Sequence, residues 1–162
     1  MKYDISLQAD AYYRVVEATR EHVRQSNLFT EAEKARIHCN GHGHIGDGNM
    51  HLNIAMEGYE HTPETQARFY EMVDPFVMNF CRENKGSVSA EHGIGYQKPH
   101  YLHYSKTNEM IDVMRQIKGV FDPNGILNPY KVLPSVWFNG TSNINQGQWA
   151  WRHVECIRRA LI

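Results

Sequence analysis

A short run of glycine, aspartate and asparagine between two histidines constrains the fold of this chain more than any other feature. Gly46, Asp47, Gly48 and Asn49 lie between His44 and residues 51–56. Glycine and asparagine tolerate the positive φ that a tight reversal needs. Residues 35–41 before the run are of mixed polarity, and residues 51–56 after it alternate between polar and apolar, as in a half-buried strand. The segment is therefore predicted to form a β-hairpin.

The hairpin gathers polar side chains that bind metals. Because side chains alternate along a strand with a period of two, we expect His44 to lie opposite His51 on one face. The same register sets His42 opposite Asn53, so that three imidazoles and a carboxamide share a face within reach of one ion. A polar hairpin whose histidines only face water is the alternative reading at this stage.

A second stretch, residues 86–95, offers a carboxylate next to an imidazole. Glu91 and His92 are flanked there by small residues and glycines that let the backbone approach a ligand. Two histidines and one carboxylate leave coordination positions open, as in catalytic zinc and facial-triad iron sites. Glu91 would complete such a set, which leaves His92 free for proton transfer near neutral pH. The alternative is a solvated loop pair with no role.

Composition and length exclude several classes of protein. The 162 residues fit one domain, and 17 Lys plus Arg against 18 Asp plus Glu give no basic surface for nucleic acid or a membrane. A glycine-rich dinucleotide fingerprint, a phosphate loop and an apolar run of membrane-spanning length are all missing from the sequence. The three cysteines, odd in number and widely spaced, fit a reducing compartment. The first residues lack the pattern of a targeting peptide.

The order of the expected elements indicates the fold class. A strand over residues 3–7 precedes a helix that Asp10 is expected to cap, and the hairpin follows. A second helix begins at Pro63, with Pro75 expected to kink or restart it, and a third covers residues 110–121 and ends at the turn 122–125. We therefore predict an α+β domain over residues 1–134, an antiparallel sheet with helices packed on one face. Residues 135–162 are predicted to be a separate tail.

Four motifs in order resemble one family. They are residues 2–7, 44–53, 86–95 and 122–131. Together they resemble the C-terminal domain of FAD-linked 2-hydroxyacid dehydrogenases, nearest to the mitochondrial D-2-hydroxyglutarate dehydrogenases, with D-lactate dehydrogenases and the glycolate oxidase D subunit as cousins. The resemblance covers residues 2–134 and implies a ferredoxin-like cap domain.

The resemblance assigns roles to individual residues. It implies that His44, His51 and Glu91 hold a zinc ion, although manganese and iron(II) accept the same ligand set. His92 would take the hydroxyl proton of the substrate as general base. Lys2 and Asn53 match substrate-binding positions, and Asn128 matches a position near the flavin. His42 is expected to stand beside the site without ligating the metal, and Asn49 and Asp47 to serve the turn.

The implied reaction is the oxidation of D-2-hydroxyglutarate to 2-oxoglutarate by hydride transfer to FAD, which an electron acceptor then reoxidises. In the family, FAD is bound mainly by a domain N-terminal to this region, so we expect this chain to pack on such a domain and to be inactive alone. A mitochondrial location follows from the resemblance. Three alternatives stay open: an inactive metal- or substrate-binding fragment, a D-lactate or glycolate dehydrogenase domain, and a hydrolase that uses zinc-bound water.

Overall fold

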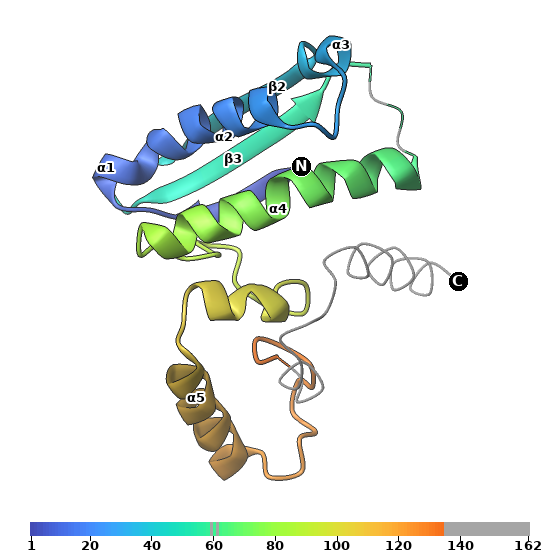
Figure 1. Cartoon of the computed structure of the whole chain (residues 1–162). Coiled ribbons are helices and arrows are strands. Elements are labelled where there is room, and N and C mark those ends of the chain that lie inside the picture. The colour runs from blue at the N-terminus through green and yellow to red at the C-terminus, as the bar shows by residue number, and fades with distance from the viewer. Residues whose placement is uncertain (59, 61, 135–162) are drawn as a thin grey trace.

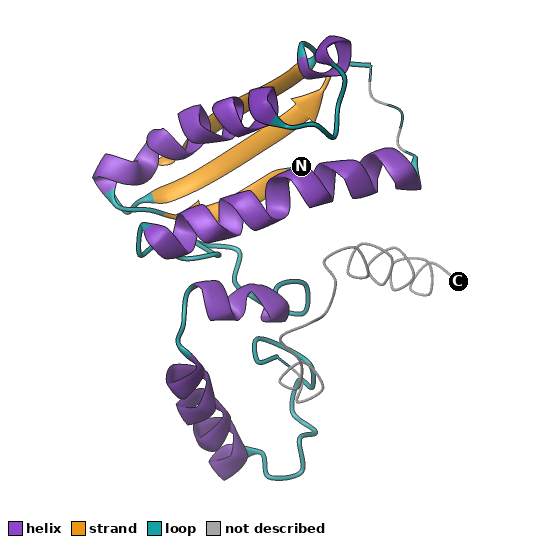
Figure 2. Cartoon of the chain, in the orientation of Figure 1, coloured by secondary structure: helices purple, strands orange, loops and turns teal. Residues whose placement is uncertain are grey.

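The sheet is antiparallel and has β3 at its centre. The computed structural model describes residues 1–58, 60 and 62–134, so the predicted tail lies outside the described residues. The three strands, β1 (Lys2–Ser6), β2 (Ile37–His44) and β3 (Asn49–Met56), are ordered β1-β3-β2. Figure 2 shows the strands beneath two long helices. The first strand lies one residue earlier than the predicted 3–7, and the hairpin strands extend further toward their turn.

Helices cover one face of this sheet. The short helix α1 (Ala9–Tyr12) leads into α2 (Arg14–Gln25), and α3 (Glu31–Lys34) precedes the hairpin. Helix α4 (Pro63–Glu83) lies beside α2 across the same face of the sheet (Figure 1). The predicted α+β fold with helices on one face is confirmed.

Two local predictions about helix ends are corrected. Helix α1 begins at Ala9, so Asp10 lies inside its first turn rather than at its cap. Helix α4 runs through Pro75 as one helix, so the predicted restart does not occur. Its start is as predicted, because the Thr62 side chain accepts a hydrogen bond from the backbone of Thr65 and Pro63 occupies the first turn.

The alternation of the strands divides the sheet into a dry face and an open face. On the dry face, Ile5, Met50, Leu52 and Ile54 are at most 1% exposed and pack in one core with the apolar sides of α2 and α4. The polar side chains that alternate with these residues point to the open face, which no long helix of the described residues covers. Lys2 and Asn53 face each other there, as do Asp4 and His51.

The hairpin register differs by two residues from the predicted one. His42, not His44, lies opposite His51, and His44 lies opposite Asn49. The reversal uses only residues 45–48, where the Asp47 backbone N–H donates to the His44 carbonyl. Because a shift of two residues keeps every side chain on its own face, the histidines still share the open face as predicted.

The close approach of the hairpin strands depends on Gly43. Its φ is 147°, and a Cβ there would lie 2.1 Å from the carbonyl oxygen of Asn49. We expect Gly43→Ala to lower the free energy of unfolding by about 1–3 kcal/mol, measured by urea unfolding. Gly46→Ala, in the same hairpin but with open space around its Cβ position, is the control and should change it by less than about 0.5 kcal/mol. Equal stability of the two variants would contradict this account of the turn.

The C-terminal part of the described chain stands apart from the sheet. A 3-10 helix, η1 (Pro99–Tyr104), leads to α5 (Asn108–Phe121), which lies away from the sheet and from α2 and α4 (Figure 1). Of the apolar residues of α5, Ile111 is buried, whereas Val113, Ile117, Val120 and Phe121 are 53–78% exposed. The predicted third helix is therefore present, with its apolar stripe uncovered. No helix in the described part of the chain is long and apolar enough to cross a membrane.

Candidate metal and substrate site

A cluster of ionisable side chains forms where the open face of the sheet meets residues 86–95. Asp4, His51, Glu91 and His92 each offer a ligand atom, and these atoms lie within 4.8 Å of one another. His51 Nε2 is 2.9 Å from Glu91 Oε1, and His92 Nε2 is 3.6 Å from the same oxygen. Residues 88 positions apart along the chain thus converge on one point. We refer to these four residues as the open-face cluster.

Strand pairing places His51 at the middle of this cluster. Asp4 is its direct partner on β1, with 3.9 Å between Asp4 Oδ1 and His51 Nδ1. On its other side His42 is its partner on β2, with 5.2 Å between the ring centroids. His42 Nδ1 is in turn 3.2 Å from the side-chain nitrogen of Asn53. His51 therefore has a carboxylate at each of its ring nitrogens and a second imidazole alongside.

Residues 86–95 are anchored to β1 by backbone bonds. Ser6 and Ser87 exchange two hydrogen bonds of 2.9 and 2.8 Å, which extends the sheet by one bridge. A Cβ on Gly86 would lie 2.5 Å from the Ser6 carbonyl oxygen, so this approach requires glycine. Lys98 also links this segment to β1, because its Nζ donates hydrogen bonds to the carbonyl oxygens of Asp4 and Val88. Burial lowers the pKa of Lys98, although the nearby Asp4 partly opposes that shift.

Asp4 on β1 holds the backbone of Glu91 and His92 by hydrogen bonds. Its carboxylate accepts the backbone N–H groups of Ala90, Glu91 and His92 at 3.0–3.3 Å, together with the Ser89 hydroxyl at 3.3 Å. Burial alone would raise its pKa. The hydrogen bonds from the backbone of His92, Glu91 and Ala90 and the charge of Lys98 outweigh burial, so the pKa of Asp4 lies below its ordinary value.

The structure brings most of the predicted site residues together. His51, Glu91 and His92 belong to the open-face cluster, and Lys2 and Asn53 are cross-strand partners one pair further along the same face. The Lys2 side chain is exposed, so its ammonium group is free to meet a ligand on that face.

Two other predicted residues, His44 and Asn128, belong neither to the open-face cluster nor to the adjacent Lys2–Asn53 pair. His44 is exposed at the end of β2, two residues beyond His42 on the same face. Asn128 lies in the exposed segment after α5, with a φ of 46° that asparagine tolerates. Their predicted roles, in metal binding and near the flavin, remain predictions.

Two residues of the site did not stand out in the sequence. Asp4 lies in the strand predicted over residues 3–7 with no role of its own, and its role appears only when residues 89–92 fold onto it. Asn49 was expected to serve the turn but is the first residue of β3, on the same face as His51, and is 4% exposed. Neither polar atom of its side chain has a hydrogen-bond partner among the described residues. Asp47 does serve the turn, because its side chain accepts the Asn49 backbone N–H.

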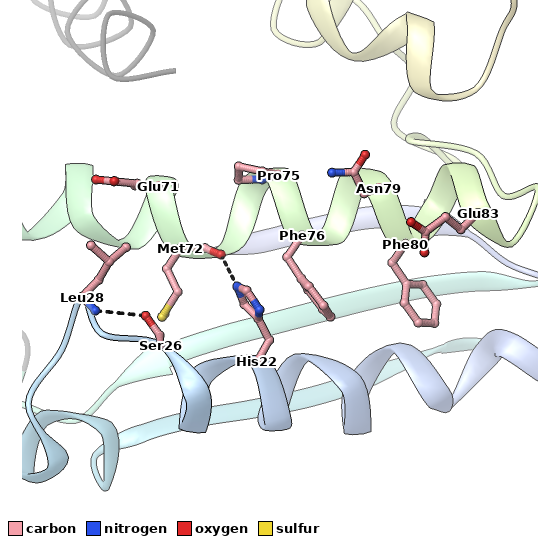
Figure 3. A pocket seen from close by; sticks show the side chains of 10 residues that line it. All are labelled: His22, Ser26, Leu28, Glu71, Met72, Pro75, Phe76, Asn79, Phe80 and Glu83. Carbon is pink, nitrogen blue, oxygen red and sulfur yellow. Dashed lines mark hydrogen bonds between the residues drawn. The ribbon is translucent and has the colours of Figure 1, made fainter. Parts of the chain in front are cut away.

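A groove on the opposite, helical side of the molecule has a different character. It lies between α2 and α4 (Figure 3) and has a volume of about 550 Å³. Its imidazole, His22, donates to the Met72 carbonyl oxygen at 2.8 Å and stacks on Phe76 with 4.2 Å between the ring centroids. Because this ring is already engaged in packing, we place the candidate site on the open face of the sheet.

The donor set of the cluster fits a divalent cation. Imidazole nitrogens and carboxylate oxygens suit zinc, manganese and iron(II), and their spacing here is compatible with one shared ion. Glu91 and His92 are also partly exposed, with 47% and 65% of their side-chain surfaces accessible. A ligand arriving from solvent could therefore complete the coordination.

Comparison with known proteins adds the family to this geometry. Residues 1–132 match the family model described as "FAD linked oxidases, C-terminal domain". The chain belongs to this family of FAD-linked oxidases. The predicted resemblance is thereby confirmed, and all residues of the open-face cluster lie inside the matched region.

Several relatives are similar over the same region. The D-2-hydroxyglutarate–pyruvate transhydrogenase of Saccharomyces cerevisiae is 44% identical over 132 residues, 82% of this chain and 25% of the relative. The putative mitochondrial D-lactate dehydrogenase of Schizosaccharomyces pombe is 41% identical over 80% of this chain and 24% of its own length. The mitochondrial D-2-hydroxyglutarate dehydrogenase of Danio rerio is 40% identical over 82% of this chain and 22% of its own length. The chain thus spans about a quarter of these relatives.

Proposed function

We propose that this chain supplies the metal and substrate site of an FAD-dependent dehydrogenase that oxidises D-2-hydroxyglutarate to 2-oxoglutarate. The observation that carries the proposal is the convergence of His51, Glu91 and His92 on the open sheet face, inside the region matched to FAD-linked oxidases. The names of the yeast and zebrafish relatives support D-2-hydroxyglutarate as the substrate. The relatives named mitochondrial support the same location for this protein.

The proposal divides the chemistry among residues of the open face. His51 and Glu91 would hold a divalent cation, with His44 on the same face as the predicted third ligand. When bound, such a cation lowers the pKa of a coordinated hydroxyl group and orients the substrate. His92, beside Glu91, would accept the hydroxyl proton as the C–H bond gives up its hydride, so that the carbon becomes a ketone.

Substrate binding would extend along β1 and β3. Lys2 and Asn53 form the next cross-strand pair after Asp4 and His51. The Lys2 ammonium group and the NH₂ group of the Asn53 carboxamide donate hydrogen bonds, which the carboxylate of a hydroxyacid can accept. D-2-hydroxyglutarate has a second carboxylate, which lactate and glycolate lack. An ion pair between that carboxylate and the Lys2 ammonium group would favour binding of the dicarboxylic acid.

Bound FAD supplies the hydride acceptor, and we propose that it is held by a separate flavin-binding domain on which this chain packs. The exposed apolar stripe of α5 supports such packing, because an uncovered row of large apolar side chains is a feature of interaction surfaces. Asn128, in the segment after this helix, would then lie near the flavin. An electron acceptor is needed to reoxidise the reduced flavin.

A substitution on α5 tests this packing. We expect Ile117→Glu to weaken binding to the purified flavin-binding domain of the yeast relative at least tenfold, or ~1.4 kcal/mol, because it places a charge on the apolar stripe. Gln116→Glu, also exposed and one residue away on the same helix, is the control and should bind as the unaltered chain does. Titration calorimetry would measure both, and equal affinities would contradict this use of α5.

A chimera tests the proposed activity itself. In it, residues 1–134 replace the matched region of the yeast relative, so that the flavin-binding portion is present. We expect it to reduce an artificial electron acceptor with D-2-hydroxyglutarate and to be slower with D-lactate and glycolate. A chimera that contains FAD but turns over none of the three acids would contradict the proposal. Preference for D-lactate would keep the reaction and change the substrate.

A further inference from the structure

Asp4 differs from the other members of the open-face cluster in how its carboxylate is used. Its side chain is 8% exposed, against 47% for Glu91 and 65% for His92. The Oδ2 atom alone accepts from the Ser89 hydroxyl and from the backbone N–H groups of Ala90, Glu91 and His92. A buried carboxylate oxygen with this many donors has little capacity left for an ion. Oδ2 is therefore poorly suited to bind a metal, while Oδ1 accepts the Glu91 backbone N–H at 3.3 Å and faces His51 Nδ1 at 3.9 Å.

The groups that donate hydrogen bonds to Asp4 include the backbone N–H groups of Glu91 and His92, the two residues with proposed roles in this segment. Holding three successive N–H groups fixes the main chain at Ala90, Glu91 and His92, and so fixes the Cα positions from which the Glu91 carboxylate and the His92 ring project. Other hydrogen bonds hold the flanks of this segment. The Ser6–Ser87 bridge and the bond from Lys98 to Val88 come before Ala90, and bonds to the carbonyl oxygens of Ile94 and Gly95 come after His92.

Asp4 also faces the metal-binding histidine. His51 presents Nδ1 toward Asp4 Oδ1 at 3.9 Å and Nε2 toward Glu91 Oε1 at 2.9 Å. The distance of 3.9 Å is longer than a hydrogen bond, but the negative charge of Asp4 still favours the His51 tautomer that carries its hydrogen on Nδ1 and leaves the Nε2 lone pair free for a metal. The Asp4 side chain thus contacts both parts of the site. Its Oδ2 atom binds residues 89–92, and its Oδ1 atom faces His51 on β3.

We propose that Asp4 is the positioning residue of this site, which holds Glu91 and His92 in place through their backbone and orients His51 to bind metal through Nε2. The inference rests on the proposed function, since it assumes that His51 and Glu91 bind the cation. It adds a residue that touches neither substrate nor metal, and it accounts for why a buried carboxylate occurs on the open face of the sheet, on β1.

The chain offers a matched control for testing Asp4. Asp122 is also buried, at 6% exposure, and its carboxylate accepts the backbone N–H groups of Ile126 and Leu127 at 3.0 Å. It stands at the end of α5, outside the open-face cluster. Asp122→Asn therefore removes a comparable structural carboxylate without touching the site.

The experiment titrates Co²⁺, whose visible absorption reports its ligands, and then Zn²⁺ by competition, into the 162-residue chain and both variants. We expect Asp4→Asn to weaken binding about 10–100-fold, as loss of a residue that orients metal ligands does, and to alter the cobalt spectrum. Asp122→Asn should bind as the unaltered chain does. Wild-type affinity in Asp4→Asn, or an equal loss in Asp122→Asn, would overturn the positioning role and leave the metal site standing. Failure of the unaltered chain to bind either ion would overturn the proposed metal site, and this inference with it.

A measurement on the unaltered chain covers the case in which Asp4→Asn does not fold. The backbone amides of Ala90, Glu91 and His92 should exchange hydrogen slowly, because a buried carboxylate holds all three. Exchange at these amides as fast as in an unstructured peptide would overturn the positioning role.

Discussion

In the chimera with a flavin-binding portion, His92→Gln is expected to lower kcat for D-2-hydroxyglutarate by about 10²–10⁴-fold. The substitution removes the proposed acceptor of the hydroxyl proton, while the backbone N–H of residue 92 can still donate to Asp4. The loss should appear in kcat more than in the affinity for the acid, because proton transfer occurs in the reaction step. Steady-state rates with an artificial acceptor would measure it.

His38 provides a matched control for His92. It is also exposed, at 61% against 65%, and its Nε2 lies 3.8 Å from a glutamate oxygen of Glu57, much as His92 lies 3.6 Å from Glu91. His38→Gln should therefore leave kcat unchanged. If His92→Gln retained the rate of the His38 variant, the proton would have to leave by another group, and the assignment of His92 as base would be wrong.

Removing a ligand from the open-face cluster is expected to abolish tight metal binding by the chain. His51→Ala and Glu91→Gln should each lower Zn²⁺ affinity by more than the ~10–100-fold typical of residues that only orient ligands. His51→Ala deletes one ligand atom of a pair that lies 2.9 Å apart, and Glu91→Gln replaces the charged carboxylate of the other by a neutral amide. Competition titration with a zinc indicator would measure the affinities, and unchanged affinity in either variant would contradict the assignment.

The same titration decides the third ligand. His44→Ala is expected to weaken binding and His42→Ala to leave it unchanged, since the family resemblance assigns the ligand role to His44. The structure makes this comparison informative, because His42 and not His44 is the cross-strand partner of His51. A loss in His42→Ala alone would transfer the third position to His42.

The sequence predicted the open face well because that prediction depends on period rather than register. Alternation along β2 and β3 fixes which side His42, His51 and Asn53 occupy, and a shift of two residues cannot change it. The register itself depends on how many residues the reversal consumes. Glycine and asparagine indicated a turn near residues 46–49 but not that Asn49 already pairs with His44 in β3.

Long-range hydrogen bonds explain what the sequence could not predict. Nothing near Asp4 in the chain indicates that it will accept the backbone of residues 90–92, because that contact forms only when two distant segments fold together. The stripe of α5 had a helical period, which predicts a helix but not what covers it. Val120 and Phe121 are 77% and 78% exposed, so the described residues do not cover them.

The most direct test of the metal site is an anomalous diffraction experiment at the zinc edge on crystals of the chain grown with zinc. We expect a strong anomalous peak about 2.0–2.2 Å from both His51 Nε2 and a Glu91 carboxylate oxygen. A peak bound only by other residues, such as the exposed His38 and Glu57 pair, would contradict the account, as would the absence of any peak at saturating zinc.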